Sequence, residues 1–335
     1  MTTEDLLILS RQDVLSLLEG KELELVQAVK SAYELHAAGA SSLPPSSFLR
    51  FPDRPRNRII ALPAYLGGDF EAAGIKWISS FPGNLEQGIE RASAVVILNS
   101  TTTGRPETIL EGSIISAKRT AASAALAAQR LHRSKGQPRL GIIGCGVINV
   151  EVARFVVALL PEIRNLSIYD LDDERVEEFR KKCLNINNEL EIEVASNVEA
   201  VLRTSSLTSI ATTALTPHIS DLSLCPAAST ILHVSLRDLT ANAILAGDNV
   251  VDDLDHVCRE NTSIHLAAQL TGNRDFVRCT LADILAGTAP ARRDAESVAV
   301  FSPFGLGVLD LAVSQLVTDL ARAESRGKRL DSFFS

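Results

Sequence analysis

The stretch Leu140-Gly-Ile-Ile-Gly144-Cys-Gly146-Val-Ile-Asn149 decides the expected fold. It lies between an apolar run that predicts a strand and a segment that predicts a helix, and a second apolar run follows and ends at Tyr169-Asp170. Gly144 permits a tight turn, and Gly146 leaves the backbone bare where a pyrophosphate can approach the free N–H groups of the helix start. The stretch therefore predicts a dinucleotide-binding loop.

Two nearby residues bear on the cofactor. Asp170 lies 26 positions after Gly144, at a strand end, where its carboxylate can hold both ribose hydroxyls and would repel a ribose phosphate. We therefore expect NAD rather than NADP. Asn149 stands where the pattern usually has its third glycine, and a side chain there should loosen or reshape the packing of helix on strand. A Gly-x-Gly string alone is often a chance turn, but the strand–helix–strand–Asp context favours nucleotide binding.

The chain around this loop alternates between apolar runs and helical segments. The candidate strands are Arg139 to Ile143, Asn165 to Tyr169, Ile192 to Ala195, Thr208 to Thr212, Thr230 to Val234 and Asn249 to Val251. Such alternation is typical of a doubly wound parallel sheet with helices on both faces. The expected fold class is therefore α/β, with a Rossmann-type sheet.

The two ends of the chain have a different texture. A helix is predicted from Lys21 to Ala38, and an Ala-rich helix from Ser113 to His132 leads to the loop Ser134-Lys-Gly-Gln-Pro. Between these helices, short extended runs broken by Pro and Gly predict a sheet with hairpin-like connections: Ser47 to Phe51, Arg58 to Pro63, Gly74 to Ser79 and Ala94 to Asn99. A final helix from Leu306 to Arg326 is long enough to rejoin this first domain.

Composition limits the classes of function. With 335 residues, 46% hydrophobic and 22% charged, the chain suits a soluble protein of two domains, and a net charge of -8 opposes a broad nucleic-acid or membrane surface. No apolar run reaches the roughly 20 residues that span a bilayer. The start, Met1-Thr-Thr-Glu-Asp, is acidic where a secretory signal is basic, so we expect a cytoplasmic protein. Five scattered cysteines without a Cys-x-x-Cys pair predict neither disulfides nor zinc.

Two cations stand in unusually apolar surroundings. Lys76 lies between Ile75 and Trp77 in an apolar run, and Arg119 lies in the Ala-rich helix. A cation is costly in such places unless it meets an anion, and an arginine offers a bidentate fork to a carboxylate. A substrate with one or more carboxylates is therefore expected. Further arginines, each more simply explained as a solvated surface charge, stand at positions 50, 54, 56, 58 and 91.

Asp238 ends the stretch Leu232-His-Val-Ser-Leu-Arg-Asp238, where a predicted strand runs out into a loop. Ligands of open parallel sheets bind beyond such strand ends, so Asp238 is a candidate proton acceptor or water activator. The alternative is a helix N-cap ahead of Leu239-Thr-Ala-Asn. A second acidic run, Asp252, Asp253, Asp255 and His256, is more simply explained as a surface turn than as a metal site, and no metal is expected.

Five segments together resemble the ornithine cyclodeaminase/mu-crystallin family over nearly the whole chain. They are Gly74-Ile-Lys76-Trp-Ile, Phe81-Pro-Gly-Asn84, Ser116-Ala-Lys-Arg119-Thr120-Ala-Ala, the Gly144-Cys-Gly146 loop and Phe304-Gly305-Leu-Gly-Val-Leu-Asp310. The resemblance implies an NAD-binding Rossmann domain, residues 116–303, and an α+β substrate-binding and dimerisation domain, residues 1–115 and 304–335. It implies a homodimer and an amino-acid carboxylate held by Arg50, Lys76 and Arg119, with Asp238 and Lys76 as catalytic candidates.

Within the family the chain is most similar to the branch of N-[(2S)-2-amino-2-carboxyethyl]-L-glutamate dehydrogenases, which make diaminopropionate for siderophores and peptide antibiotics. The similarity lies in Arg58-Ile-Ile-Ala-Leu-Pro and Glu90-Arg91-Ala-Ser93-Ala-Val-Val-Ile-Leu-Asn. Cyclodeaminases carry a Thr-Val type string at Arg91-Ala-Ser93 and an Asp-Cys-Pro-Gly-Lys loop at Asp238. The implied substrate has three carboxylates, which makes Arg58 and Arg91 candidates for additional carboxylate ligands.

The expected reaction is an NAD-dependent oxidative hydrolysis to 2-oxoglutarate and L-2,3-diaminopropionate, with Asp238 or Lys76 activating water. The alternatives are an ornithine cyclodeaminase, another imine reductase or amino-acid dehydrogenase of the family, and a ligand-binding protein without catalysis. The candidate cofactor-binding residues are Ser93, Arg119, Thr120, Gly144, Gly146, Val147, Ile148, Asp170, Thr213 and Gly305.

Overall fold

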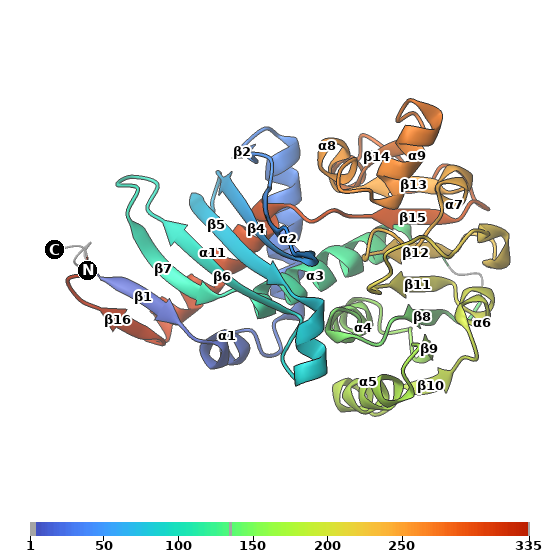
Figure 1. Cartoon of the computed structure of the whole chain (residues 1–335), viewed down its shortest axis with the longest axis horizontal. Helices are drawn as coiled ribbons and strands as arrows, with labels where there is room; N and C mark the ends of the chain where they lie inside the picture. The colour runs from blue at the N-terminus through green and yellow to red at the C-terminus, as the bar shows by residue number, and fades with distance from the viewer. Residues whose placement is uncertain (1–4, 134–135, 334–335) are drawn as a thin grey trace. The chain divides into compact units, whose positions relative to one another are not determined.

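The computed structural model describes residues 5–133 and 136–333, in two compact units. One unit comprises Met1–Arg119 and Leu306–Ser335, and the other comprises Thr120–Gly305, so the division falls inside helix α3 (Ser113–Leu131). Residues 1–4 of the acidic start and the first two residues of the predicted loop 134–138 lie outside the described residues. Each unit has its own sheet (Figure 1).

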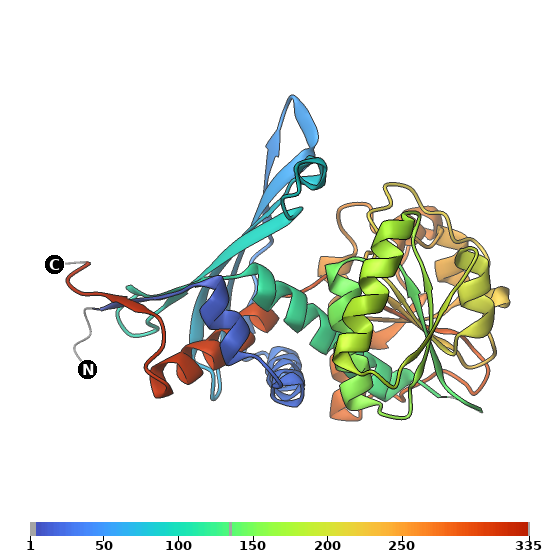
Figure 2. The same ribbon diagram turned by 90° about the horizontal axis from the view of Figure 1, so that it is seen from below.

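The sheet of the second unit has the strand order β10-β9-β8-β11-β12-β15-β13-β14, and every neighbouring pair is parallel. Its strands are β8 (Arg139–Ile143), β9 (Asn165–Tyr169), β10 (Glu191–Val194), β11 (Leu207–Ile210), β12 (Thr230–His233), β13 (Asp248–Val251), β14 (Val277–Thr280) and β15 (Ala299–Ser302). Helices lie on both faces of this sheet (Figure 2). The predicted doubly wound α/β class is therefore confirmed.

The helices of the second unit connect these strands in the alternating manner that the sequence predicts. They are α4 (Val147–Leu159), α5 (Asp173–Ile186), α6 (Val198–Thr204), α7 (Ala241–Ala246), α8 (Leu254–Val257), α9 (Ser263–Thr271) and α10 (Leu281–Ala286), with a 3-10 turn η2 (Leu222–Leu224). All residues of β11, β12, β13 and β15 are buried, as expected of strands covered on both faces. This burial makes the sheet centre the core of the unit.

The six predicted strands of this sheet are present, with ends within two residues of the prediction, but β14 and β15 were not predicted. Length does not explain this, because β10 to β13 also have four residues each and were predicted. The Val-Arg-Cys-Thr sequence of β14 contains no apolar run, whereas the Ala-Val-Phe run of β15 is a signal that was missed. The strand β15 lies between β12 and β13, so the sheet order could not have been drawn without it. Pairing with neighbours far away in sequence, rather than local pattern, makes these residues strands.

The first unit has a mixed sheet in the order β16-β1-β7-β6-β5-β4-β2, with β3 paired to β4. The strands are β1 (Leu6–Leu9), β2 (Ser41–Ser42), β3 (Ser47–Phe51), β4 (Arg54–Leu66), β5 (Ala72–Ser80), β6 (Ala92–Asn99), β7 (Pro106–Glu111) and β16 (Lys328–Leu330). Among the described strands of this sheet, only the pair β1–β7 is parallel. The four predicted extended runs lie in β3, β4, β5 and β6, and strands from both chain ends meet in β1 and β16.

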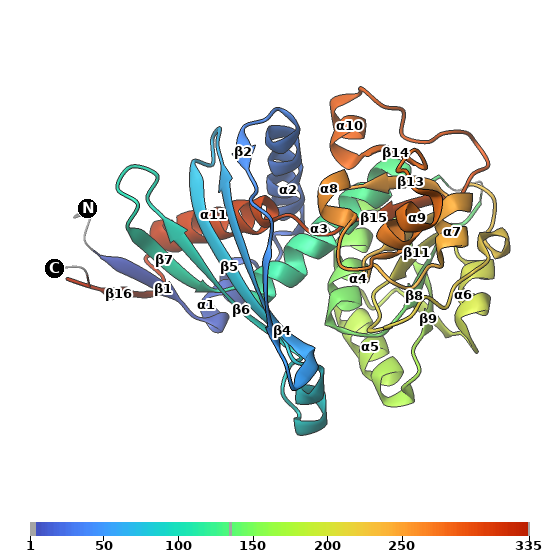
Figure 3. The same cartoon turned by 45° about the horizontal axis from the view of Figure 1, so that its top comes forward.

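Helices cover one face of this sheet (Figure 2). They are α1 (Arg11–Leu17), α2 (Glu22–Ala37) and α11 (Gly307–Ala323), and a 3-10 segment η1 (Pro82–Gln87) joins β5 to β6. The predicted helices at both chain ends are α2 and α11, which pack on each other (Figure 3). Helix α1 was missed, although Ser10 and Asp13 form a capping box, a spacing that marks helix starts.

Among residues 5–133 and 136–333, no helix is both long enough and apolar enough to cross a bilayer.

Candidate active site

The glycine loop follows β8 at the carboxyl end of the parallel sheet. Gly144 has a φ of +92°, and a Cβ atom there would lie 2.5 Å from the carbonyl oxygen of Ala211, so only glycine fits this turn. Gly146 is the N-cap of α4, and a Cβ atom built on it would meet nothing within 4 Å. The space over Gly146 is open, as a pyrophosphate approaching the helix start requires. The predicted loop therefore fits NAD.

Asp170 is fixed beside this loop. Its Oδ2 accepts a hydrogen bond of 2.7 Å from the backbone nitrogen of Cys145, and its Oδ1 accepts one of 3.1 Å from Asp172. The carboxylate thus lies between the glycine loop and the end of β9, where a ribose would be held. Cys145 brings no thiolate to the loop, because burial and the charge of Asp170 raise the pKa of its thiol to about 12.

Asn149 links the loop to its neighbours by hydrogen bonds, so of the two predicted effects, looser or reshaped packing, the structure favours the second. The side chain is fully buried, and its Nδ2 donates to the carbonyl oxygens of Ile143 at 3.0 Å and Gly144 at 2.7 Å. Its Oδ1 accepts a bond of 2.6 Å from the hydroxyl of Ser209 on β11. The amide therefore joins α4, the turn after β8 and the next strand, because its polar atoms find three partners in place of the close packing that glycine allows.

Asp252 departs from the expected surface turn, because it is buried. Its carboxylate accepts backbone hydrogen bonds from Phe304 at 2.9 Å and Gly305 at 2.7 Å, and burial raises its pKa. Asp252 therefore anchors the segment with the cofactor candidate Gly305. Its neighbours are also engaged: Asp253 caps α8, and Asp255 pairs with Arg274 at 2.7 Å. In the described part of the chain, no group of three or more His, Cys, Asp or Glu side chains could hold a metal.

Asp238 lies just after β12 and is buried. Its carboxylate accepts hydrogen bonds from the hydroxyls of Thr212 and Ser235, and its backbone nitrogen donates to Nε2 of His233 at 3.1 Å. Burial alone would raise the pKa of Asp238, but the His233 ring and the two hydroxyl donors outweigh it and lower the pKa. Asp238 is therefore an ionised carboxylate, suited to accept a proton.

The N-cap alternative for Asp238 was wrong. Helix α7 begins after Thr240, whose hydroxyl accepts from the backbone nitrogen of Ala243 at 3.2 Å. The Thr240 hydroxyl already fills the cap position, and Asp238 lies two residues too early for that task. The loop before Asp238 is held in place by Arg237, whose guanidinium donates to the carbonyl oxygens of Glu260 and Asn261.

Lys76 and Arg119 both meet an anion, as their apolar surroundings suggested, but this anion is a carboxylate of the chain itself, Asp310. Lys76 lies on β5 and is 2% exposed, and its Nζ lies 2.7 Å from Oδ2 of Asp310 on α11. Arg119 donates from Nε to Oδ1 of the same carboxylate at 3.0 Å. Burial lowers the pKa of Lys76 to about 8, against the opposing charge of Asp310. Asp310 was missed as a site residue, although an acid on an otherwise apolar helix face signals a buried partner.

A second group of cations gathers at the other end of the same sheet face. Strand register places Arg50 on β3 opposite Arg58 on β4, and Arg58 opposite Ser80 at the end of β5, four residues from Lys76. Burial and then the charge of Arg58 lower the pKa of Arg91, which precedes β6, so these two guanidinium groups lie close enough to oppose each other. Arg54 and Arg56 are exposed. Ser93 pairs with Ser79 through their hydroxyls at 2.9 Å.

The other cofactor candidates lie at the start of α4, in the loop after β11 and within α3. Val147 and Ile148 open α4, with Val147 58% exposed, and Thr213 lies in an exposed loop after β11. Thr120 lies within α3. In the second unit the structure therefore brings Val147, Ile148 and Thr213 to the carboxyl end of β8 and β11 with the glycine loop, the edge where ligands of such sheets bind.

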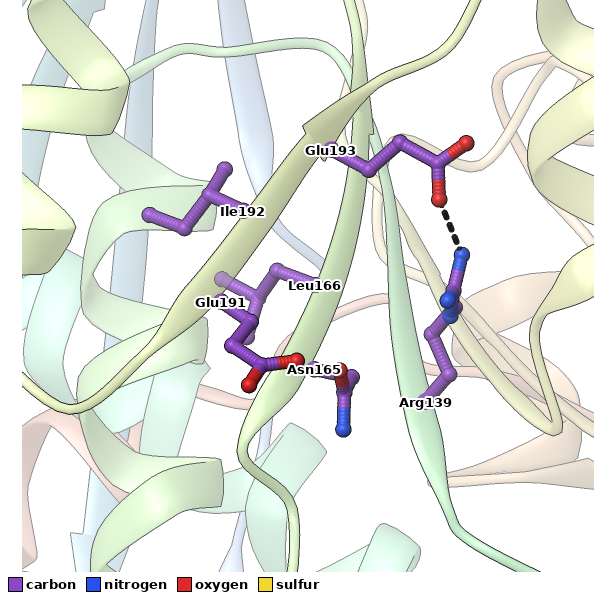
Figure 4. Close-up of a pocket in the computed structure, with 6 residues that line it drawn as sticks. All are labelled: Arg139, Asn165, Leu166, Glu191, Ile192 and Glu193. Atoms are coloured by element: carbon purple, nitrogen blue, oxygen red, sulfur yellow. Dashed lines mark hydrogen bonds and ion pairs between the residues drawn. The ribbon is translucent and has the colours of Figure 1, made fainter.

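A hollow on the second unit lies at the opposite edge of its sheet, at the amino ends of β8, β9 and β10. Arg139, Asn165 and Glu191 begin these strands, and Arg139 pairs with Glu193 across the hollow (Figure 4). Ligands of doubly wound sheets bind beyond the carboxyl ends of the strands. The hollow is therefore not part of the candidate active site.

The comparisons with known proteins identify the family of this chain. The ornithine cyclodeaminase/mu-crystallin family matches residues 4–325, and the chain belongs to that family. It is 27% identical to N-((2S)-2-amino-2-carboxyethyl)-L-glutamate dehydrogenase of Staphylococcus aureus, over 98% of this chain and 99% of the relative.

Two solved structures show the same fold. One is the Δ1-pyrroline-2-carboxylate reductase of Thermococcus litoralis in complex with NADH and L-proline: TM-score 0.89, 25% identity, 96% of this chain and 99% of that chain. The other is an archaeal alanine dehydrogenase dimer with bound NAD: TM-score 0.88, 26% identity, 98% of this chain and 100% of that chain.

Proposed function

We propose that this chain catalyses the NAD-dependent oxidative hydrolysis of N-[(2S)-2-amino-2-carboxyethyl]-L-glutamate. The products are 2-oxoglutarate, L-2,3-diaminopropionate and NADH, and the diaminopropionate would supply a siderophore or a peptide antibiotic. In broader terms, the chain is an NAD(H)-dependent oxidoreductase that acts on CH–NH bonds, in line with its family and its relatives.

The arrangement of cations on one sheet face carries the substrate assignment. Lys76 and Arg119 form one group, and Arg50, Arg58 and Arg91 form another. Arg58 is paired with Ser80, which lies four residues further along β5 than Lys76, a distance of about 13 Å. The arginine side chains of the second group are long, so the gap between their guanidinium groups and the first group would be shorter than this backbone distance. Two separated groups of cations suit a substrate with carboxylates at both ends, such as the proposed tricarboxylate, better than one with a single carboxylate.

The cofactor would bind through the glycine loop. Gly144 and Gly146 leave the backbone accessible at the start of α4, and Asp170 would hold the ribose hydroxyls. The chemistry that NAD would supply when bound is acceptance of the hydride that leaves the glutamate α-carbon.

The chain's own residues would bind the substrate and move protons. Lys76 and Arg119 would hold a carboxylate, and Arg58 and Arg91 would hold another. Oxidation of the CH–NH bond leaves a carbon–nitrogen double bond, to which water adds before the carbon–nitrogen bond breaks. Asp238 is ionised and would accept the proton of that water, while Lys76, with a pKa of about 8, could donate or accept one near neutral pH.

The enzymatic alternatives make different demands on the site. L-Alanine has one carboxylate and would leave Arg58 and Arg91 without a function. Ornithine carries a second cation, which the Arg58–Arg91 group would repel. The alternative of a ligand-binding protein without catalysis does not explain an ionised Asp238 held by two hydroxyls.

The deciding experiment follows NADH absorbance with purified protein and NAD. N-(2-amino-2-carboxyethyl)-L-glutamate should give NADH together with equimolar 2-oxoglutarate. L-Alanine and L-ornithine serve as parallel substrates, with detection of pyruvate and proline. Turnover of L-alanine alone would replace the proposal with an alanine dehydrogenase, and proline without net NADH would make the protein a cyclodeaminase.

We also propose that the protein works as a homodimer. The sheet face of the first unit opposite its helices carries apolar side chains from adjacent strands: Ile59, Ala61, Pro63, Ile75, Trp77, Val95, Ile97 and Ile109. Strand alternation places them opposite Lys76 and Val96, which face the helices. Trp77 in this set is 40% exposed. A contiguous apolar face of this kind suits an interface between two copies of the chain.

A further inference from the structure

A single carboxylate joins the two buried cations of the first unit. Asp310, in the first turn of α11, accepts from Lys76 Nζ at 2.7 Å and from Arg119 Nε at 3.0 Å. Its side chain is fully buried. The three residues come from β5, α3 and α11, which are distant in sequence. Three charged side chains therefore meet where the sheet packs against its helices.

The charge balance of this cluster depends on Asp310. Two cations and one anion leave a net charge of +1, which one substrate carboxylate would neutralise. Without Asp310, two like charges would lie buried with no counter-ion, a costly arrangement. Two side chains besides Asp310 face the Lys76 ammonium: Arg119, which disfavours its charge, and Ser116, whose hydroxyl lies 3.3 Å away.

The hydrogen bonds also leave donors for a ligand. Arg119 binds Asp310 through Nε, and within the described residues its two terminal nitrogens have no hydrogen-bond partner. Lys76 donates to Asp310 and Ser116, and its third proton meets no acceptor in the same residues. Asp310 therefore fixes both cations. The two terminal nitrogens of the Arg119 guanidinium and one proton of the Lys76 ammonium remain as donors for another anion.

We infer that Asp310 is a positioning residue, which orients Lys76 and Arg119 and keeps Lys76 charged so that a substrate carboxylate meets a preformed pair of cations. Its importance for catalysis rests on the proposed function of these cations as carboxylate ligands. The effect of Asp310 on the protonation of Lys76 is a separate property, which can be measured without turnover.

The experiment is a titration of Lys76 by NMR. The full chain is labelled with [ε-13C]lysine, and the Lys76 signal is the one that the Lys76→Arg variant lacks. We expect a midpoint near pH 8 in the unaltered protein. In Asp310→Asn the midpoint should fall by at least ~1 pH unit, because the anion that favours the ammonium is gone. An unchanged midpoint in a folded variant would overturn the inference.

A second variant covers the case in which Asp310→Asn does not fold. The double variant Arg119→Gln/Asp310→Asn removes one cation together with one anion, so it does not leave two like charges buried without a counter-ion. Its Lys76 midpoint should lie below that of Arg119→Gln alone, because only the single variant keeps the anion that favours the ammonium. Equal midpoints in these two variants would overturn the inference. Calorimetry with 2-oxoglutarate and NADH-saturated protein tests the carboxylate site itself. If the unaltered protein fails to bind 2-oxoglutarate, the proposed function is at fault, while the titration still decides the part that Asp310 plays.

Discussion

The Asp238 carboxylate is buried and yet ionised, because its partners outweigh the loss of water. Two hydroxyl donors, from Thr212 and Ser235, come from loops after neighbouring strands β11 and β12. A group held in this way is a strong candidate for proton transfer, because its charge does not depend on solvent access.

Replacement of Asp238 with Asn should lower kcat at least ~100-fold if the carboxylate accepts a proton in the reaction. The shape of the side chain stays the same, so NAD affinity should stay within a few-fold. Steady-state kinetics on the proposed substrate and calorimetric titration with NAD measure the two effects.

Thr240→Ala is the matched control for Asp238→Asn. It removes the true cap of α7 and should reduce stability by about 1 kcal/mol, with little change in kcat. If Asp238→Asn loses only thermal stability and keeps its turnover, the carboxylate is structural and the assignment of a proton acceptor fails.

Asp170 is the residue that we propose to set the choice between NAD and NADP. Asp170→Ala removes the acceptor that holds the Cys145 nitrogen and the proposed ribose ligand, so NAD affinity should fall roughly tenfold to hundredfold. Discrimination against NADP should relax, because the repelling charge is gone. Fluorescence titrations with NADH and NADPH give both numbers. Asp172→Ala, which removes the cap of α5, should leave cofactor preference unchanged.

At the start of α4, Asn149 stands where the loop pattern usually has its third glycine. Helix, turn and strand meet at Asn149, and its three hydrogen bonds fix their relative positions. A glycine at this position allows close packing by having no side chain, whereas an asparagine succeeds because every polar atom of its amide is satisfied.

Asn149→Gly therefore tests whether the usual loop pattern or the hydrogen bonds matter more. We expect a loss of about 1–3 kcal/mol of stability, since the Ser209 hydroxyl and two carbonyl oxygens lose their partner. NAD affinity should fall as well, because the turn loses its attachment to α4. Urea unfolding monitored by circular dichroism, repeated with Ser209→Ala and the double variant, isolates the coupling between the two side chains. A more stable Asn149→Gly protein would contradict this account.

At the scale of the whole molecule, the open sheet face of the first unit leads to a prediction about assembly. Trp77→Asp places a charge in the apolar face, and we expect monomers in sedimentation or light scattering, with the secondary structure retained. Leu270→Asp changes a side chain that is 62% exposed on α9 and serves as the control. If Trp77→Asp stays dimeric, the interface lies on another surface.

The sequence by itself determined the second unit well. Glycine positions, apolar runs and the Asp at a strand end are local features, and the loop from Gly144 to Asp170 follows from them because each residue acts on its own neighbours in the chain. The cations Lys76 and Arg119 were also visible, because a charge in an apolar run is unusual wherever it occurs. The strand β14 was not visible, because its sequence Val-Arg-Cys-Thr contains no apolar run, and the short apolar run of β15 was overlooked.

Only the tertiary structure decided which charges meet. Asp310 lies 234 residues from Lys76 and 191 from Arg119, and no local spacing reveals that one carboxylate joins them. Nor does local spacing reveal that Asn149 binds Ser209, that Asp252 binds Gly305, or that Thr240 rather than Asp238 caps α7. Hydrogen bonds and ion pairs act over about 3 Å, so they depend on how the chain folds back on itself, whereas period and composition are properties of the chain alone.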